Sequence, residues 1–357
     1  MWLSSFLVTA VLILLGWVWI RPRRTRSSYP LTDKATRALL HEAPSCEAAN
    51  EPQSLARFSQ MLSSFPSTND IDECAEQVRA LVRSGLLEYR AHESDPEQIL
   101  KVSGYVSTDH AALMTRFTVQ YNLYAGSVVA LGTDEQRAEL YETQASGELG
   151  CFAFTELGAG VMTGVRVDTV AEYDRERDLF VITSASIEAR KNWISQGSVA
   201  ERAVVLARLR VDGTDLGPHL FWVRLRQSGH GLQRGVSISL VPEKNSMLGL
   251  DNAIIDFQGF EAPRSALLSR FASLDRDGKY QASLPRGCRR ILDLVLTRLL
   301  TGRLCLSEFA LAHALELLRH NWAYCERRRL FRGEQTMSQV LSGFFVDRAR
   351  CLAVLLV

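Results

Sequence analysis

The spacing of apolar residues changes twice along the chain and predicts helices, then strands, then helices again. From about residue 39 to residue 140 apolar residues lie three or four positions apart, as in the run Ile71, Ala75, Val78, Leu81 and Val82. This is the period of a helix with one buried face. Thr133 follows Gly132 and is placed to cap a helix that starts there. The pattern predicts an N-terminal α-helical domain over residues 31–149.

After Gly150 the period becomes that of β-strands. Short β-branched or alternating runs are separated by turn residues such as Asp212-Gly213 and Gly217-Pro218, and the runs cover residues 179–183, 203–209, 219–225, 236–240 and 254–257. The links between the runs are too short to hold crossover helices. We therefore expect an antiparallel β-barrel or sandwich over residues 150–270.

Helical spacing returns from Arg289 onward. The apolar positions fall on one stripe, which consists of Ile291, Leu292, Val295, Leu299, Leu300 and Leu304. They predict a C-terminal helical domain over residues 285–357. The expected fold class is α+β, with an N-terminal helical domain, a central antiparallel β-barrel or sandwich and a C-terminal helical bundle.

The first residues are expected to lie outside this fold. Residues 2–20 are almost wholly apolar, and a cluster of arginines follows within residues 21–26. At 1.5 Å per residue the apolar segment spans roughly 28 Å, near the hydrocarbon thickness of a bilayer. It predicts a transmembrane anchor within residues 1–30, with the body on the cytosolic side. A cleaved secretory peptide and an organelle presequence are the alternatives.

Composition narrows the class of protein further. A formal net charge of +1 leaves no basic excess to neutralise a nucleic-acid backbone, so no nucleic-acid partner is expected. The 7 cysteines form no C-x-x-C pair, which indicates reduced thiols inside a cell and no zinc site. The sequence also lacks a P-loop, an H-E-x-x-H motif and a G-x-S-x-G motif.

Two short blocks carry the candidate chemistry. Residues 151–160 place a glycine-rich turn after an apolar strand, and such a turn lets backbone amides approach a flat or anionic ligand. Residues 191–196 contain Trp193 and Ser195, an indole face beside a short hydroxyl, which suits a planar ring that forms hydrogen bonds. A tight turn followed by a core tryptophan is the alternative interpretation.

These blocks, together with other stretches, resemble the acyl-CoA oxidase and dehydrogenase family over about residues 100–350. The similar stretches are residues 132–136 with 146–151, 155–156, 193–195, 257–268 and 326–331 with 338–339. The order of helices, strands and helices is also the layout of this family. The resemblance implies FAD as the cofactor and a C-terminal helical domain that is incomplete in this chain.

By the same resemblance, individual residues receive roles at the flavin. Phe152 and Thr155 would lie along the pyrimidine side of the isoalloxazine ring, with Trp193 packed on the ring. Ser195 would form a hydrogen bond near the reactive flavin nitrogen.

Arg328 and Gln339 would contact the FAD of a dimer partner, and Arg303 would lie near the acyl-CoA. As single helix residues, these arginines would more often be solvated surface charges.

The resemblance does not assign any residue of this chain as the catalytic base. The family removes the α-proton of the acyl thioester with a glutamate, which generally comes after the region of Ser338-Gln339, and this chain stops at Val357. A minority of relatives place it at the position that Gly302 occupies here. Glu308 and Glu316 lie further along that helix and are expected to be exposed. No catalytic residue is therefore assigned.

The function implied is FAD-dependent oxidation of a fatty acyl-CoA to the trans-2-enoyl-CoA, the first step of fatty acid β-oxidation. Oxidase is preferred over dehydrogenase, with oxygen or an electron-transfer flavoprotein as the electron acceptor. The expected assembly is a homodimer or a dimer of dimers, and a peroxisome or mitochondrion is the alternative location. A catalytically incomplete family member that serves as a binding or scaffold protein is the alternative function.

Overall fold

The structure is a computed structural model that describes residues 53–104, 110–160, 166–226, 231–242, 244–330 and 335–337. The chain divides into two compact units, residues 46–321 and residues 1–45 together with 322–357. In the second unit the described residues form the end of a helix and the antiparallel pair β12 (Arg329–Leu330) and β13 (Gln335–Thr336). The larger unit holds both motif blocks.

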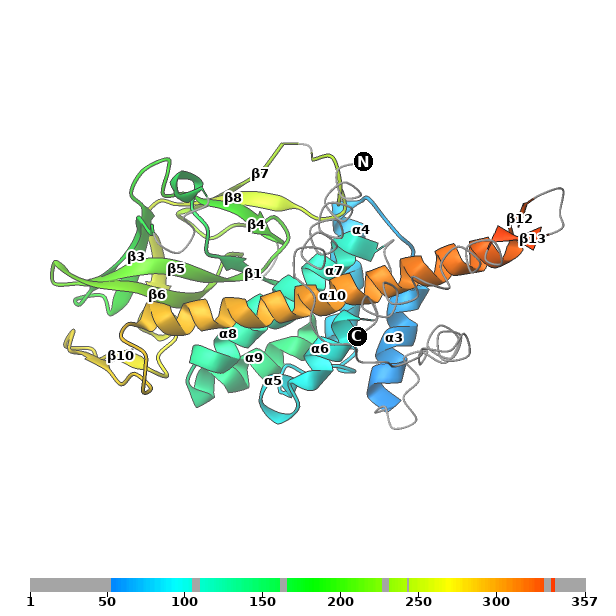
Figure 1. Cartoon of the computed structure of the whole chain (residues 1–357). Helices are drawn as coiled ribbons and strands as arrows, with labels where there is room; N and C mark the ends of the chain where they lie inside the picture. Colours follow the sequence, from blue (N-terminus) through cyan, green and yellow to red (C-terminus); the bar gives the residue numbers. More distant parts are fainter. Residues whose placement is uncertain are drawn as a thin grey trace, which may run out of the picture. The chain divides into compact units, whose positions relative to one another are not determined.

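Helices fill the first part of the larger unit (Figure 1). They are α3 (Gln53–Ser64), α4 (Ile71–Arg83), α5 (Ala91–Ser94), α6 (Glu97–Ser103), α7 (Ala111–Phe117), the π-helix η2 (Thr118–Ala125), α8 (Gly126–Leu131) and α9 (Asp134–Ser146). The predicted cap of α9 is confirmed, because the Thr133 side chain accepts from the Gln136 backbone N–H while the Gln136 side chain bonds the Thr133 backbone. Gly147, with a φ of 73°, ends α9 in the left-handed conformation that glycine adopts without strain.

The strands form two main sheets and a small hairpin. The larger sheet has the order β1-β5-β2-β3-β9, with β6 paired to β5, and the smaller has the order β4-β8-β7. Their bounds are β1 Gly150–Ala153, β2 Thr169–Asp174, β3 Leu179–Ser184, β4 Lys191–Ser195, β5 Arg202–Val211, β6 Thr214–Arg224, β7 Val236–Leu240, β8 Asn252–Phe257 and β9 Phe260–Pro263. Strands β10 (Ala272–Leu274) and β11 (Tyr280–Ala282) form the hairpin, and 3-10 turns cover Leu157–Ala159 and Arg264–Ala266.

The prediction of a purely antiparallel sheet is wrong. Strand β5 pairs in parallel with both β1 and β2. Short links exclude parallel pairing only between strands that follow one another in sequence. Strand β5 pairs with strands further back in the chain. The chain between β2 and β5 passes through β3 and through β4 of the smaller sheet, so that strands make the crossover that a helix usually makes. Gly217-Pro218 lies within β6 rather than between strands.

Two hydrophobic cores lie on the two faces of the larger sheet. Phe152 of β1 and Val204 of β5 belong to the core that the helices share, whereas Cys151 and Val205 belong to the core between the sheets. Successive side chains of a strand point to opposite faces, so these buried strands read as continuous apolar runs. The layers are therefore helices, the larger sheet and the smaller sheet.

Among the described residues beyond 285, one long helix forms the start of the predicted C-terminal helical domain. Helix α10 (Ile291–Arg327) has 37 residues and passes from one unit into the other. Its first turns are held by Ile291, Leu292 and Val295, which are buried. Leu300 and Leu304 continue the predicted stripe but are exposed. The domain boundaries at residues 30, 149, 270 and 285 stay predictions.

The prediction of a fold that includes a transmembrane helix is also wrong. None of the helices in the part of the chain that the structure describes is both long enough and apolar enough to span a bilayer. The segment on which that prediction rested, residues 2–20, lies outside the described residues.

Candidate functional site

The fold brings the two motif blocks side by side in antiparallel fashion. The backbone N–H of Asn192 donates to the Thr155 carbonyl at 2.9 Å, and that of Leu157 donates to the Arg190 carbonyl at 2.9 Å. The glycine-rich turn is held as well, because Gly158 N–H donates to the Glu188 carbonyl at 2.8 Å. A Cβ at Gly158 would come within 2.6 Å of the Glu188 side chain, so this close approach requires glycine. Thr155 therefore lies beside the strand that carries Trp193 and Ser195.

A buried ion pair fixes this arrangement. Lys191 Nζ lies 2.8 Å from Glu156 Oε1, and both side chains are shielded from water. The Glu156 carboxylate also accepts from Asp168 N, Thr169 N and Thr169 Oγ1, while Lys191 donates to the Leu206 carbonyl at 2.6 Å. Burial lowers the pKa of Lys191, and the Glu156 charge opposes that shift. Each charge is thus satisfied, as a buried pair requires.

Trp193 is not a core residue. Its side chain is 56% exposed, whereas the next residue, Ile194, is buried. Trp193 has a φ of 61°, and the pairing of β4 with β8 shifts register between Lys191 and Ile194. A bulky residue with positive φ is an outlier that rigid surroundings must maintain. Trp193 is therefore exposed, which excludes the alternative of a core tryptophan.

The other three predicted ring contacts differ in exposure. Phe152 is 8% exposed and stacks on Phe154 with ring centroids 5.4 Å apart, in the core shared with the helices. Thr155 and Ser195 are half-buried. Ser195 Oγ accepts a hydrogen bond from Asn252 Nδ2 at 3.1 Å, so its own proton is free to be donated elsewhere.

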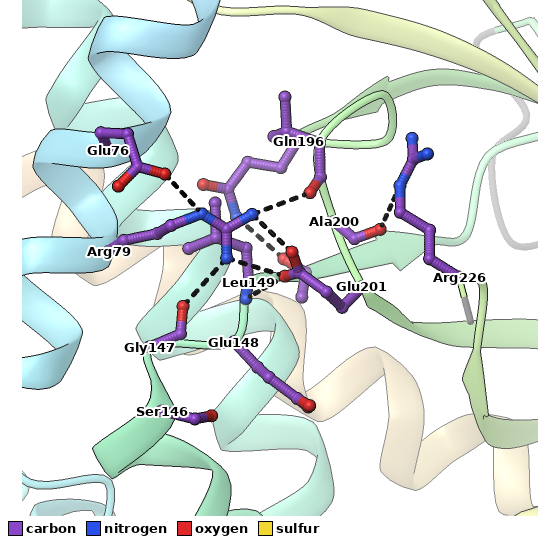
Figure 2. A network of polar contacts seen from close by, with 12 residues as sticks. Glu76, Arg79, Ser146, Gly147, Glu148, Leu149, Gln196, Ala200, Glu201 and Arg226 are labelled. Atoms are coloured by element: carbon purple, nitrogen blue, oxygen red, sulfur yellow. Dashed lines mark hydrogen bonds and ion pairs between the residues drawn. The ribbon is translucent and has the colours of Figure 1, made fainter. Parts of the chain in front are cut away.

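A polar network joins the helices to the strands (Figure 2). Arg79 of α4 donates to both carboxylate oxygens of Glu201, at 3.0 and 2.5 Å, and to the carbonyls of Gly147 and Val199. Glu201 in turn accepts from Leu149 N–H at 2.7 Å. The arginine therefore anchors the segment that leads into β1.

Gln120 of the π-helix supports the same strand from within the core. It accepts from Gly150 N–H at 2.8 Å, and it bonds Gln196, which lies at the end of β4 and donates to the Gly150 carbonyl at 2.8 Å. Both glutamines are buried. The sequence patterns did not single out Gln120 or Arg79, because their partners lie far away along the chain.

The residues predicted on or after the long C-terminal helix stay predictions. Arg303 is exposed on α10, one turn or less from Thr301, which donates to Asn122 Oδ1 at 2.8 Å. Arg328 is exposed in the smaller unit, and Gln339 lies outside the described residues. Glu308 is exposed, as expected, whereas Glu316 is half-buried.

Two hollows on the described residues are lined by other side chains. One hollow, of about 540 Å³, is lined by residues of the helices such as Arg83, Arg90 and Tyr141. A second hollow of about 350 Å³ lies beside Gln136 and Arg264. Neither contains a predicted ring contact, and the described residues contain no cluster of metal-binding side chains.

The residues of the candidate site suit a flavin. A flat ring system needs an exposed aromatic surface and hydrogen-bond donors at its edge, and β4 carries both the exposed Trp193 and the half-buried Ser195. Thr155 supplies a second hydroxyl on the neighbouring segment. The chemistry of this donor set therefore fits the isoalloxazine ring.

The chain is similar in sequence to curated acyl-CoA oxidases. No family model matches the chain. It is 33% identical over 253 residues to acyl-coenzyme A oxidase 2 of Yarrowia lipolytica, covering 68% of the chain and 35% of the relative. It is 34% identical over 245 residues to the peroxisomal acyl-coenzyme A oxidase 2 of Arabidopsis thaliana, covering 66% and 35%.

A solved structure shows the same fold. Acyl-CoA oxidase-2 of Caenorhabditis elegans, bound with FAD, ascaroside-CoA and ATP, superimposes with a TM-score of 0.58 at 20% identity, covering 75% of this chain and 40% of that one. The chain thus spans about a third of the length of the two curated relatives. It belongs to the acyl-CoA oxidase family.

Proposed function

We propose that the face formed by residues 152–155 and 193–195 binds FAD and that the protein takes part in the oxidation of a fatty acyl-CoA to the trans-2-enoyl-CoA. The observation that carries this proposal is the exposed Trp193 on β4, the strand that also carries Ser195 and that a buried ion pair joins to the segment of Thr155. The family relationship and the FAD bound to the Caenorhabditis elegans relative support it. Oxygen as the acceptor is favoured because the relatives are oxidases.

Each residue contributes by position rather than by covalent chemistry. Trp193 covers one face of the ring and excludes water there, while Thr155 and Ser195 direct hydroxyls to the ring edge. Phe152, packed in the helix-side core, fixes the strand from which Thr155 extends. When bound, FAD supplies the acceptor for the β-hydride, a role that no side chain can fill.

Further elements of the proposal rest on the resemblance. Arg303 is proposed to contact the acyl-CoA, and Arg328 and Gln339 to reach the FAD of a partner in a homodimer or a dimer of dimers. The relative from Arabidopsis thaliana is peroxisomal, which supports a peroxisomal location for this protein.

One observation favours a second function, a flavin-binding protein that does not turn over acyl-CoA. Position 302, where the resemblance would place the base of a minority of relatives, is glycine and lies against η2. A Cβ at this position would come within 3.0 Å of Asn122 Nδ2, so a glutamate there requires Asn122 to move.

Anaerobic addition of acyl-CoAs of several chain lengths to the FAD-loaded protein separates the two functions. Loss of the flavin absorbance on a timescale of seconds supports oxidation, and Glu308→Gln and Glu316→Gln then test the nearby carboxylates. Unchanged absorbance with every acyl-CoA supports the binding protein. In that case Gly302→Glu, with Gly302→Gln as its matched control, tests whether a carboxylate at this position restores the reaction.

A further inference from the structure

Ser195 is bonded from behind by a residue of the neighbouring strand. Asn252, the first residue of β8, pairs with Ser195 and is 4% exposed. Its Nδ2 donates to Ser195 Oγ at 3.1 Å, and its Oδ1 accepts from Lys244 Nζ at 2.6 Å. Lys244, in the loop between β7 and β8, also donates to the Leu250 carbonyl. A chain of hydrogen bonds therefore runs from Lys244 through Asn252 to Ser195.

The hydrogen bonds from Lys244 through Asn252 to Ser195 have a fixed direction. A lysine ammonium carries only donors, so the oxygen of the Asn252 amide must face it. The NH2 group of Asn252 then has to face Ser195, and the Ser195 oxygen has to accept. The proton of the Ser195 hydroxyl is thereby left for an acceptor other than Asn252.

The turn that follows Ser195 is held by separate contacts. Asp251 Oδ2 accepts from both the backbone N–H and the hydroxyl of Ser198, at 2.8 and 2.7 Å. Asp251 Oδ1 lies 2.9 Å from Nη2 of the buried Arg116. The neighbouring residues 251 and 252 thus have different tasks, because Asp251 secures the turn and Asn252 contacts the hydroxyl at the candidate site.

We propose that Lys244 and Asn252 are positioning residues that hold the Ser195 hydroxyl as an outward donor to an acceptor nitrogen of the flavin ring, an inference that rests on the proposed function. The reactive ring nitrogen of oxidised flavin accepts a hydrogen bond, whereas in reduced flavin it carries hydrogen and donates. A serine fixed as donor therefore favours the oxidised form. Loss of either positioning residue lets Ser195 rotate and accept, which shifts the midpoint potential of the bound flavin to more positive values.

Titration of the apoprotein with FAD tests this proposal without any turnover. Ser195→Ala, Asn252→Leu and Lys244→Met are each expected to raise the Kd by about 2- to 12-fold, the range for one neutral hydrogen bond. In the Ser195→Ala background, Asn252→Leu is expected to add no further loss, because it acts through that hydroxyl. Ser198→Ala, in the same turn, and Lys279→Met, an exposed lysine, are the matched controls and should leave the Kd unchanged.

Several results would overturn the positioning role. An equal loss from Asn252→Leu in the wild-type and Ser195→Ala backgrounds would show that Asn252 acts on structure alone. Lys244→Met and Asn252→Leu could both leave the Kd and the midpoint potential unchanged while Ser195→Ala still weakens FAD binding. That result would refute the positioning role but leave the proposed function standing. Absence of FAD binding by the wild-type chain would refute both. If far-ultraviolet circular dichroism shows that Asn252→Leu does not fold, Lys244→Met tests the positioning role in its place.

Discussion

The ammonium of Lys191 lies 2.8 Å from the carboxylate of Glu156, and the pair joins the two sequence blocks of the candidate site. The Lys191 side chain is 0% exposed and that of Glu156 is 1% exposed. An isolated charge at such a depth is strongly destabilising, whereas this pair is completed by backbone and hydroxyl donors around Glu156. The position of the turn before Gly158 thus depends on a contact that is out of reach of solvent.

Lys191→Met is expected to lower the free energy of unfolding by about 3–5 kcal/mol, because it leaves the Glu156 charge buried without its counter-ion. Urea unfolding of the apoprotein measures this change. The matched control is Lys101→Met, since Lys101 pairs with Glu97 on the surface with 51% of its side chain exposed. Equal stability of the two variants would contradict the structural role of the buried pair.

Arg79→Met is expected to destabilise the protein by about 3 kcal/mol, because Glu201 loses a partner that bonds both of its oxygens. The Arg79 side chain is only 16% exposed, whereas that of Arg83, one turn further along α4, is 50% exposed. Arg83→Met therefore serves as the control and should change the unfolding midpoint far less. A smaller effect for Arg79→Met than for Arg83→Met would argue against the anchor drawn in Figure 2.

Trp193→Ala is expected to separate ligand binding from stability. Since the indole is 56% exposed, its removal should change the unfolding free energy of the apoprotein by less than about 0.5 kcal/mol. It should weaken FAD binding by about 1–3 kcal/mol, the range for stacking of a flat heteroaromatic ring on an aromatic side chain.

Trp222→Ala is the matched control for Trp193→Ala. Trp222 is 5% exposed and donates to the Tyr124 hydroxyl at 3.0 Å, so its loss should cost about 3–5 kcal/mol of stability. If Trp193→Ala destabilised the apoprotein as much as Trp222→Ala does, the assignment of Trp193 to the ligand face would be wrong.

The burial of His219 predicts that the stability of the protein depends on pH. Its Nδ1 lies 2.9 Å from the Gly217 carbonyl and its Nε2 lies 2.9 Å from the Tyr280 hydroxyl. Since a carbonyl only accepts, Nδ1 carries the proton and Nε2 accepts from Tyr280. Burial lowers the pKa of His219, although the Gly217 carbonyl and the Asp215 charge oppose that shift.

Because the folded pKa of His219 lies below the unfolded value of about 6.5, the unfolded chain binds the proton more readily. The free energy of unfolding should therefore fall as the pH decreases through about 6.5 and level off below the folded pKa. His219→Gln, which does not titrate, should make this fall smaller when urea unfolding is compared from pH 7.5 to about 5. An identical pH profile for wild type and His219→Gln would contradict the buried neutral imidazole.

Local patterns predicted the elements but not how distant elements pair. The run 236–240 coincides with β7 (Val236–Leu240), and Thr133 caps α9, because periodicity and capping depend on neighbouring residues. The parallel pairing of β5 depends on contacts between distant strands. The contact of Arg79 with Glu201 joins residues 122 positions apart and has no local signature.

The sequence also predicted only part of the candidate site. The resemblance placed Thr155 and Ser195 at the ring, and these assignments stay predictions. The sequence could not tell whether Trp193 was buried, because an indole within a strand suits either a core or a surface. Asn252 was missed, since a polar pair before an apolar strand reads as a turn.

The measurement that tests the central claim most directly is the cofactor content of the purified full chain. Visible absorption of the folded protein, followed by release and identification of the cofactor, should show a flavin spectrum and FAD near one per chain, either as purified or after FAD is added to the apoprotein. A folded, colourless protein that takes up no added FAD would contradict the account.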